Sequence, residues 1–229
     1  IATLCCSPPE SWFGKWCDLS KILIETQNLK KSYQHLNGNI ILFNNLNLKI
    51  KEGDLVALVG PSGSGKSSLL HLLALLDEPT RGDIKINNIF TKNFTDEKKD
   101  ETRRKNISII FQDNNLLNDF TAIENVMMPL IIKGENMENA KNKAKTILKA
   151  IKILDRSQHF PNELSGGEQQ RVAIARALIA KTNLILADEP TGNLDYKTSR
   201  EIFSYFLKIK KLKKTIIFAT HNRELANRA

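Results

Sequence analysis

A single eight-residue loop constrains what this chain can fold into more than any other feature. Residues 60–67 read Gly-Pro-Ser-Gly-Ser-Gly-Lys-Ser, directly after the apolar stretch Leu55–Val59 and before a helix-like run that starts at Ser68. This G-x-x-x-x-G-K-[ST] pattern, placed between a strand and a helix, is typical of a phosphate-binding loop. Its glycines can adopt backbone angles that are closed to other residues, so successive amides can turn inward around an anion. The sequence therefore predicts a nucleotide site.

The residues of this loop have distinct expected tasks. Gly60, Gly63 and Gly65 are the positions at which the backbone is expected to need unusual angles. Lys66 is expected to reach the β- and γ-phosphates of a nucleoside triphosphate, and the Ser67 hydroxyl to bind Mg²⁺. The helix that follows points the positive end of its dipole at the same place. The expected nucleotide-binding residues here are Gly60, Pro61, Ser62, Gly63, Ser64, Gly65, Lys66, Ser67 and Ser68.

Polar residues follow three further apolar stretches that have the length of buried strands. Gln112 follows the first, Asp188 and Glu189 end the second, and His221 follows the third. Continuous apolar strands that alternate with helical patterns indicate a parallel sheet covered on both faces. Ligands on such sheets bind beyond the carboxyl ends of the strands. We therefore expect an α/β fold in which these residues converge with the phosphate loop on one edge.

Each of these residues suits a step of phosphoryl transfer. Asp188 can help hold Mg²⁺ directly or through water, and Glu189 can polarise a water for attack on the γ-phosphorus. His221 can contact the γ-phosphate, and the Gln112 amide can sense the metal and the attacking water. Taken alone, each could be an ordinary polar residue at a strand end. Beside a phosphate loop, the catalytic interpretation is favoured.

The rest of the chain carries strand and helix patterns on both sides of the loop. Strands are expected over residues 22–29, 40–43, 46–50 and 84–87, with Lys31-Ser32-Tyr33 ending the first. Helices are expected from the phosphate loop to Leu76, over about 140–151, from 165 onward and over about 196–211, with an exposed helix or loop over 95–105. Residues 116–130 mix turn residues with apolar ones, and no element is assigned to them.

Composition narrows the functional classes. The chain has 229 residues and a formal charge of +9, but its lysines are scattered and form no compact basic block, so no nucleic-acid partner is expected. The charge fits a solvated surface that favours an anionic membrane face. No apolar run approaches the roughly 18 residues that a membrane-spanning helix needs. All cysteines fall within the first 17 residues, which fits a reducing cytoplasm and excludes a disulfide framework for the core.

A second motif separates the classes of phosphate-loop protein, which include kinases, GTPases and transport ATPases. Leu-Ser-Gly-Gly-Glu-Gln at 164–169 precedes Asp188, Pro190 follows Glu189, and Asp195 closes a Gly-Asn-Leu-Asp turn. With these motifs the chain over 22–229 resembles the ABC transporter ATPase family. The resemblance implies a phosphate-loop NTPase fold of ABC type, with a mainly parallel sheet core, an antiparallel β subdomain and a helical subdomain at about 92–163. Residues 1–21 form an extension outside the family pattern, and relatives usually continue past the position of Ala229, so a truncated C-terminal end is expected.

The resemblance also implies partners and further roles. Two copies would pair head to tail, with each ATP and its Mg²⁺ between the phosphate loop of one copy and the signature residues of the other. Those signature residues are Ser165, Gly166, Gly167 and Glu168. Tyr33 would stack on adenine, and Asp195 would connect the two sites across the dimer. The Gln112–Leu130 region would receive a helix from an integral membrane subunit.

Three segments narrow the resemblance further. Residues 116–130, 189–195 and 221–226 look like the lipoprotein-releasing branch of the family, although the macrolide-export and cell-division branches share much of this pattern. The Gln112-Asp113 pair is somewhat like the cell-division branch. The resemblance thus implies an ATP-hydrolysing subunit peripheral to the cytoplasmic side of a bacterial inner membrane. Soluble ABC ATPases that act on nucleic acid or ribosomes usually carry two ATPase units, whereas this chain has one signature and one phosphate loop.

Overall fold

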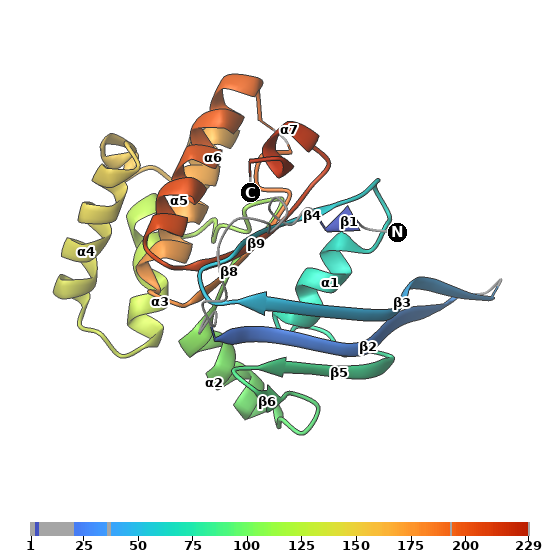
Figure 1. The fold of residues 1–229 in the computed structure, drawn as a ribbon. Coiled ribbons are helices and arrows are strands. Elements are labelled where there is room, and N and C mark those ends of the chain that lie inside the picture. Colours follow the sequence, from blue (N-terminus) through green and yellow to red (C-terminus); the bar gives the residue numbers. More distant parts are fainter. Residues whose placement is uncertain (1–2, 5–20, 36–37, 193, 229) are drawn as a thin grey trace, which may run out of the picture.

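The computed structural model describes residues 3–4, 21–35, 38–192 and 194–228 (Figure 1). The strands are β1 (Thr3–Leu4), β2 (Ile22–His35), β3 (Gly38–Lys51), β4 (Leu55–Val59), β5 (Arg81–Ile86), β6 (Ile89–Phe90), β7 (Ile107–Ile110), β8 (Leu184–Asp188) and β9 (Thr215–Thr220). The helices are α1 (Lys66–Leu73), α2 (Asp96–Asn106), α3 (Ala122–Ile132), α4 (Met137–Ala150), α5 (Gly166–Ile179), α6 (Tyr196–Lys211) and α7 (Arg223–Ala226). Apart from β1 and Lys21, the expected extension over 1–21, including its cysteines, lies outside the described residues.

The central sheet has the order β1-β4-β9-β8-β7, and its pairs are parallel except for β1 against β4. Every residue of β8 and β9 is buried. Alternate residues of these strands pack into two different hydrophobic clusters, one on each face of the sheet. The prediction of a parallel sheet covered on both faces is therefore confirmed.

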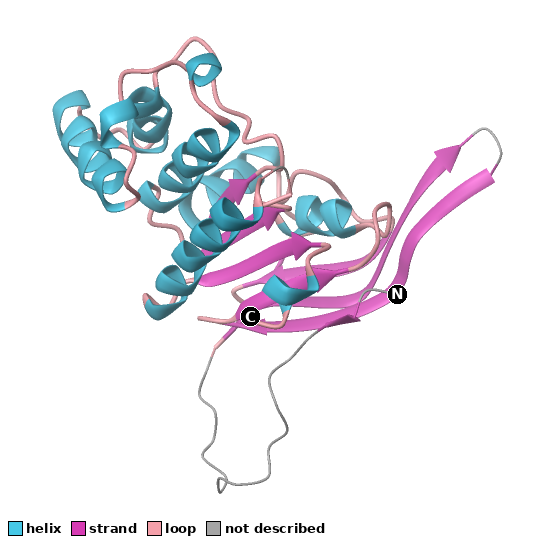
Figure 2. Ribbon diagram, turned by 90° about the horizontal axis from the view of Figure 1, so that it is seen from above, coloured by secondary structure: helices cyan, strands magenta, loops and turns pink. Residues whose placement is uncertain are grey.

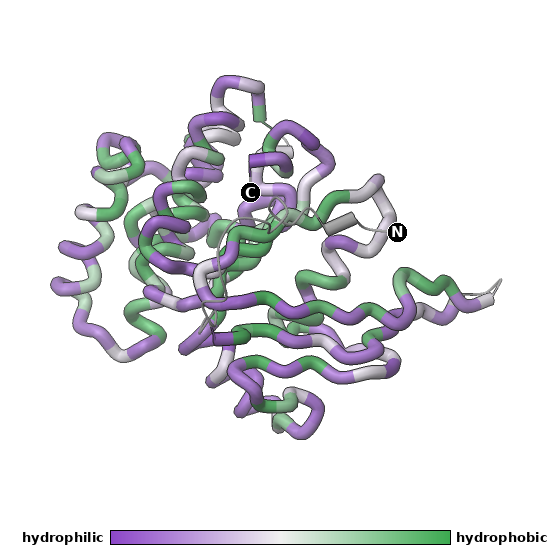
Figure 3. The backbone as a smooth tube through the Cα atoms, in the orientation of Figure 1, coloured by the Kyte–Doolittle hydropathy of each residue, from purple (hydrophilic) through white to green (hydrophobic). Residues whose placement is uncertain are grey.

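Different layers cover the two faces. One face packs against α5, α6 and α7, where a trio of phenylalanines, Phe203, Phe206 and Phe218, is fully buried. The other face packs against α1, which lies between the parallel sheet and an antiparallel sheet of order β3-β2-β5-β6. Figure 2 shows most of the helices gathered at one end of the molecule and the long β2–β3 ribbon projecting from the other. In Figure 3 the most hydrophobic backbone follows the central strands.

The antiparallel sheet is longer than predicted. β2 does not end at Lys31–Tyr33 but continues to His35, and the two short strands expected at 40–43 and 46–50 form one strand, β3. Tyr33 faces solvent on a half-covered sheet, where polar residues are compatible with a strand, and Lys31 is buried in an ion pair with Asp77. Register shifts between the two strands absorb the irregular pattern, and Asn45 has a positive φ of 57° there.

Two helices differ from their sequence patterns. α1 ends at Leu73 rather than Leu76, because Leu75 turns the chain with a φ of 58°. α3 occupies part of residues 116–130, whose mixed pattern predicts no element. It begins with a capping box in which the Glu124 carboxylate accepts a hydrogen bond from the Thr121 amide at 2.8 Å.

The predicted helical subdomain of about 92–163 is not entirely helical. It contains β7, a strand of the parallel sheet, so the helices that extend beyond the sheet begin only with α3. The exposed segment over 95–105 is the helix α2, capped by Thr95. Within the described part of the chain, none of the helices combines the length and the apolar character needed to cross a bilayer.

Candidate functional site

The phosphate loop lies between β4 and α1, as predicted, and its glycines serve two different purposes. Gly63 and Gly65 have φ values of 78° and 87°, in the left-handed region that favours glycine. Gly60 does not share this geometry, so the expectation of an unusual backbone angle was wrong there. A Cβ on Gly60 would come within 2.6 Å of the Ser64 Oγ, so any side chain at this position would force Ser64 to move.

Lys66 is the charged group at the centre of the loop. Only 7% of the residue is exposed, and its Nζ donates to the carbonyl oxygens of Gly60 at 3.0 Å and Pro61 at 3.1 Å. The same Nζ lies 3.5 Å from Glu189 Oε1, in a different part of the sequence. A buried ammonium is stable only with such partners. The loop therefore holds a cation at the start of α1, whose amide dipoles add positive potential.

Glu189 connects the cation to a third strand. Its Oε2 lies 3.1 Å from the Nδ1 of His221, while Oε1 faces Lys66. The Glu189 amide donates to the Ala219 carbonyl of β9 at 3.1 Å, and its φ of 41° is strained for a residue with a side chain. The carboxylate is thus fixed between an ammonium and an imidazole at the carboxyl edge of the sheet.

Asp188 has the properties of a metal-binding carboxylate. It is 8% exposed, and its Oδ1 is buried without a hydrogen-bond partner among the described residues. An ionised oxygen in such a position is costly unless a cation or a water reaches it. Ser67, in the first turn of α1, supplies a hydroxyl after the loop that follows β4, which is separated from β8 by β9 in the sheet. One carboxylate and hydroxyl or amide oxygens fit Mg²⁺, which takes few protein ligands when phosphates supply the rest.

Gln112 lies in a loop that α5 holds in place. The Arg176 guanidinium of α5 donates to the carbonyl oxygens of Asn114 and Asn115, both at 2.7 Å. Both asparagines have positive φ, and burial lowers the pKa of Arg176. Gln112 is exposed and lines a small hollow together with Gly166 and Glu189, among other residues. The structure therefore brings Gln112 to the same edge as Glu189.

A family model described as "ABC transporter" matches residues 43–192. The chain is 49% identical over 212 residues to the lipoprotein-releasing system ATP-binding protein LolD of Rickettsia bellii, covering 92% of this chain and 93% of that protein. It is 43% identical over 207 residues to LolD of Syntrophus aciditrophicus, covering 90% and 93%. The chain belongs to the ABC transporter ATP-binding family. Among solved structures, the dimeric post-hydrolysis cassette MJ0796 bound to ADP and Pi is similar with a TM-score of 0.84 at 41% identity, covering 89% of this chain and 90% of that one.

The family signature forms the start of α5. Ser165 caps the helix in a capping box, where its amide and hydroxyl both donate to Glu168 Oε2 at 2.8 Å. Hydrogen bonds from the Ser165 amide and hydroxyl hold the pKa of Glu168 below its usual range, and Arg156 adds to this. The polar contacts of Ser165 and Glu168 within the described chain do not reach the phosphate loop. The structure therefore does not join the signature to the loop of the same copy.

Two further residues implied by the family resemblance lie outside the Lys66–Glu189 cluster. Asp195 caps α6 by accepting from the Thr198 amide at 3.0 Å, and these hydrogen bonds lower its pKa. Tyr33 lies on β2 with 45% of the residue exposed, and its hydroxyl donates to Asp77 Oδ2 at 3.1 Å. Both are placed on surfaces that a second molecule can reach.

Sequence reasoning missed several residues that shape this family member's site. Arg176 holds a loop, and Asp77 holds side chains of β2, that are far from them in sequence, and no local pattern indicates such pairs. Asn125 is fully buried and holds the chain before α3 through hydrogen bonds to three carbonyls, including that of Leu117 at 3.0 Å. The Thr-x-x-Glu pattern at Thr121 indicates the start of α3, but Pro129, which lies inside this helix, argues against a helix in the sequence.

Proposed function

We propose that this chain is the ATP-binding and ATP-hydrolysing subunit of an ABC transporter that releases lipoproteins from an inner membrane. The observation that carries the proposal is the row Lys66, Glu189 and His221 along the carboxyl edge of the sheet, linked at 3.5 and 3.1 Å. These residues belong to a chain that is 49% identical to a lipoprotein-releasing system ATP-binding protein. The LolD names of these relatives favour this branch over the macrolide-export and cell-division alternatives.

ATP binding follows from the chemistry of the loop. The amides of residues 60–68 and the Lys66 ammonium would hold the β- and γ-phosphates, since the ammonium can exchange its carbonyl partners for phosphate oxygens. Ser67, Asp188 and Gln112 would hold Mg²⁺, with Asp188 acting directly or through water. The metal would supply positive charge that stabilises the transferred phosphoryl group. Tyr33 would stack on the adenine.

Hydrolysis requires a water aligned with the γ-phosphorus. The Glu189 carboxylate would orient this water and accept its proton as the oxygen attacks, giving ADP and phosphate. His221 would keep Glu189 in position through the 3.1 Å contact and reach the γ-phosphate from the neighbouring strand. Gln112, across the hollow from Glu189, would complete the polar surroundings of the water.

The site is half of a pair in this proposal. The signature residues Ser165–Glu168 sit at a helix start whose amides suit a γ-phosphate. Among the described residues, the side chains of Ser165 and Glu168 bond to each other and to Arg156, not to the phosphate loop. A second copy, placed head to tail, would bring its signature to this loop, and Asp195 would connect the two sites. A similar cassette is known as a dimer.

Membrane attachment would come from partners. Integral membrane subunits would dock near Gln112–Leu130, on the cytoplasmic side of a bacterial inner membrane, and no nucleic acid is involved. The loop that begins at Gln112 suits this task because it connects the edge that carries the nucleotide site directly to α3. Co-purification of the tagged chain with integral membrane proteins, rather than with RNA, would support this arrangement.

Substitution of Lys66 tests nucleotide binding directly. We expect Lys66→Ala to weaken ATP binding about 10- to 100-fold, because one charge-assisted hydrogen bond contributes roughly 1.5–3 kcal/mol. Isothermal titration calorimetry with Mg-ATP measures the change, and circular dichroism verifies folding. Lys149→Ala, on the exposed face of α4, is the matched control and should bind as the unmodified chain does. Equal affinities for Lys66→Ala and the control would contradict the proposal.

A further inference from the structure

The ring of Tyr33 is held by an ion pair that lies beneath it. Lys31 and Tyr33 are two residues apart on β2 and therefore share one face of the strand. The Lys31 Nζ lies 4.7 Å from the centroid of the Tyr33 ring, and Tyr33 donates its hydroxyl hydrogen to Asp77 Oδ2 at 3.1 Å. One face of the ring and its hydroxyl are thus both engaged within the chain.

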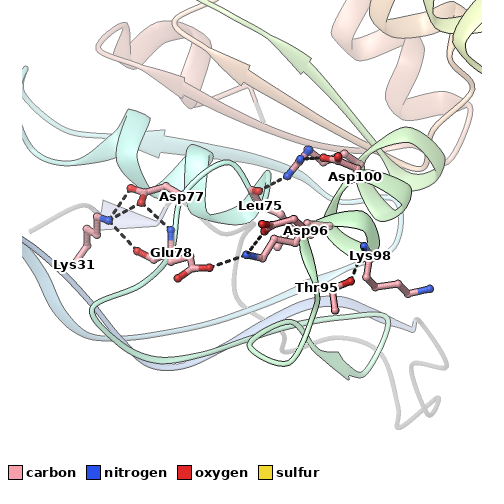
Figure 4. A network of polar contacts seen from close by, with 10 residues as sticks. Lys31, Leu75, Asp77, Glu78, Thr95, Asp96, Lys98 and Asp100 are labelled. Atoms are coloured by element: carbon pink, nitrogen blue, oxygen red, sulfur yellow. Dashed lines mark hydrogen bonds and ion pairs between the residues drawn. The ribbon is translucent and has the colours of Figure 1, made fainter.

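Lys31 is a buried charge with specific partners. It is 7% exposed, and its Nζ donates to Asp77 Oδ1 at 2.7 Å and to the Glu78 carbonyl at 2.8 Å (Figure 4). A buried ammonium without such partners would be strongly unfavourable. Its place over the ring adds a cation–π attraction that fixes the ring plane.

Asp77 is itself fixed from a second side. It lies in the loop after α1, where Glu78 binds Lys99 of α2 at 2.6 Å and the Leu75 carbonyl accepts from Arg103 of α2 (Figure 4). On the β2 side, Thr80 Oγ1 accepts from the Ser32 amide at 3.0 Å. The loop that carries Asp77, the acceptor of the Tyr33 hydroxyl, is therefore held by contacts to both α2 and β2. A movement of β2 alone would not move Asp77 with it.

We propose that Lys31 and Asp77 are positioning residues that hold the plane of the Tyr33 ring for stacking on the nucleobase. This inference rests on the proposed function, in which Tyr33 contacts the adenine. With one ring face covered by the ammonium, only the opposite face can accept a base. The Lys31–Asp77 pair thereby contributes to the part of the ATP affinity that depends on the base. The part that depends on the phosphates comes from the loop at 60–68.

This division predicts two different responses to two ligands. Stacking of one base on an aromatic side chain is worth about a 5- to 150-fold change in affinity, so Tyr33→Ala should weaken ATP within this range. Asp77→Ala removes both the hydroxyl's acceptor and the counter-ion of Lys31, and should weaken ATP about 3- to 10-fold as part of the same effect. Inorganic triphosphate has no base, so both variants should bind it as the unmodified chain does.

The experiment is calorimetry of the full chain with Mg-ATP and with Mg-triphosphate. Asp77→Ala, Tyr33→Ala and their double variant form a thermodynamic cycle, in which the double variant should bind ATP no more weakly than Tyr33→Ala. Asp83→Ala is the matched control, because Asp83 forms its ion pair with Lys92 at 3.2 Å rather than with Lys31 or Tyr33. Tyr33→Phe removes only the hydroxyl at an exposed position, and should weaken ATP about 2- to 5-fold with triphosphate unchanged.

Each outcome supports or overturns the inference. Equal losses for ATP and triphosphate in Asp77→Ala would assign the pair a purely structural role. A further loss in the double variant, or ATP binding by Tyr33→Phe that equals that of the unmodified chain, would also overturn it. Should Asp77→Ala fail to fold, Tyr33→Phe alone decides. Failure of the proposed function is distinct, since an unmodified chain that binds neither ligand would refute nucleotide binding itself.

Discussion

The substitution Glu189→Gln tests the catalytic assignment most sharply. It removes the negative charge and the proton-accepting capacity of the side chain while preserving its size. The geometry favours retention of the fold, because an amide can still contact His221 Nδ1, now 3.1 Å from Oε2, and Lys66, now 3.5 Å from Oε1. The backbone strain at this position, with φ of 41°, is unchanged by the substitution.

The size of the expected effect follows from the role of a general base. Loss of such a group lowers the rate by about 10²- to 10⁴-fold. This corresponds to roughly 3–5 kcal/mol in the activation free energy, since each factor of ten is about 1.4 kcal/mol. ATP binding should be maintained or tightened, because Lys66 loses a competing anion and becomes more available to phosphate oxygens.

Two measurements separate these effects. Steady-state phosphate release at saturating Mg-ATP gives kcat, and calorimetry gives Kd. Glu138→Gln, at an exposed position in the first turn of α4, is the control and should leave both unchanged. Near-normal hydrolysis by Glu189→Gln would refute the reasoning, and so would a loss of turnover that arises only from lost ATP binding.

Two further predictions concern stability. Phe206→Ala should lower the free energy of unfolding by about 3–5 kcal/mol in a denaturant titration, because Phe206 is fully buried against Phe203 and Phe218, whereas Leu212→Ala, at a position 69% exposed, should change it by less than about 0.5 kcal/mol. Burial acts to raise the pKa of Asp77, but hydrogen bonds from Lys31 and the Glu78 amide outweigh it and lower the pKa below the ordinary 3.8. A lowered carboxyl pKa stabilises the fold above the ordinary value and loses that contribution as pH falls through the folded value, so Asp77→Asn should flatten the acid limb of the stability curve below about pH 4.

The core of the fold and the edge that carries the site could be predicted because their signals are local in sequence. A buried parallel strand is a short apolar run, and the residue that follows it lies at the binding edge whatever the strand order. Gln112, Asp188 and His221 could therefore be assigned to one edge before their neighbours were known. The strand order β4-β9-β8-β7 had no such signal, because it depends on which strands pair across long stretches of chain.

The remaining differences have the same origin. β2 and β3 extend through polar residues because each supplies the other's hydrogen bonds, which a single strand's pattern does not show. Ser64 leaves little room for a side chain at Gly60, and the Lys31–Asp77 pair joins residues 46 positions apart. Such contacts exist only once the layers have assembled. Local patterns therefore identify the groups that do the chemistry, while tertiary packing decides which residues hold them in place.

Helix α5 shows how these two kinds of residue are joined. Its first turn carries the signature capped by Ser165, and its last turn carries Arg176, whose guanidinium holds the carbonyls of Asn114 and Asn115. The 14 residues of the helix span about 20 Å as one rigid rod. A tilt of α5 that moves the signature toward a second copy must therefore also move the loop that carries Gln112, or break two charge-assisted hydrogen bonds. In the proposed head-to-tail dimer, approach of the signature to the second copy and movement of the Gln112 loop are for this reason expected to occur together.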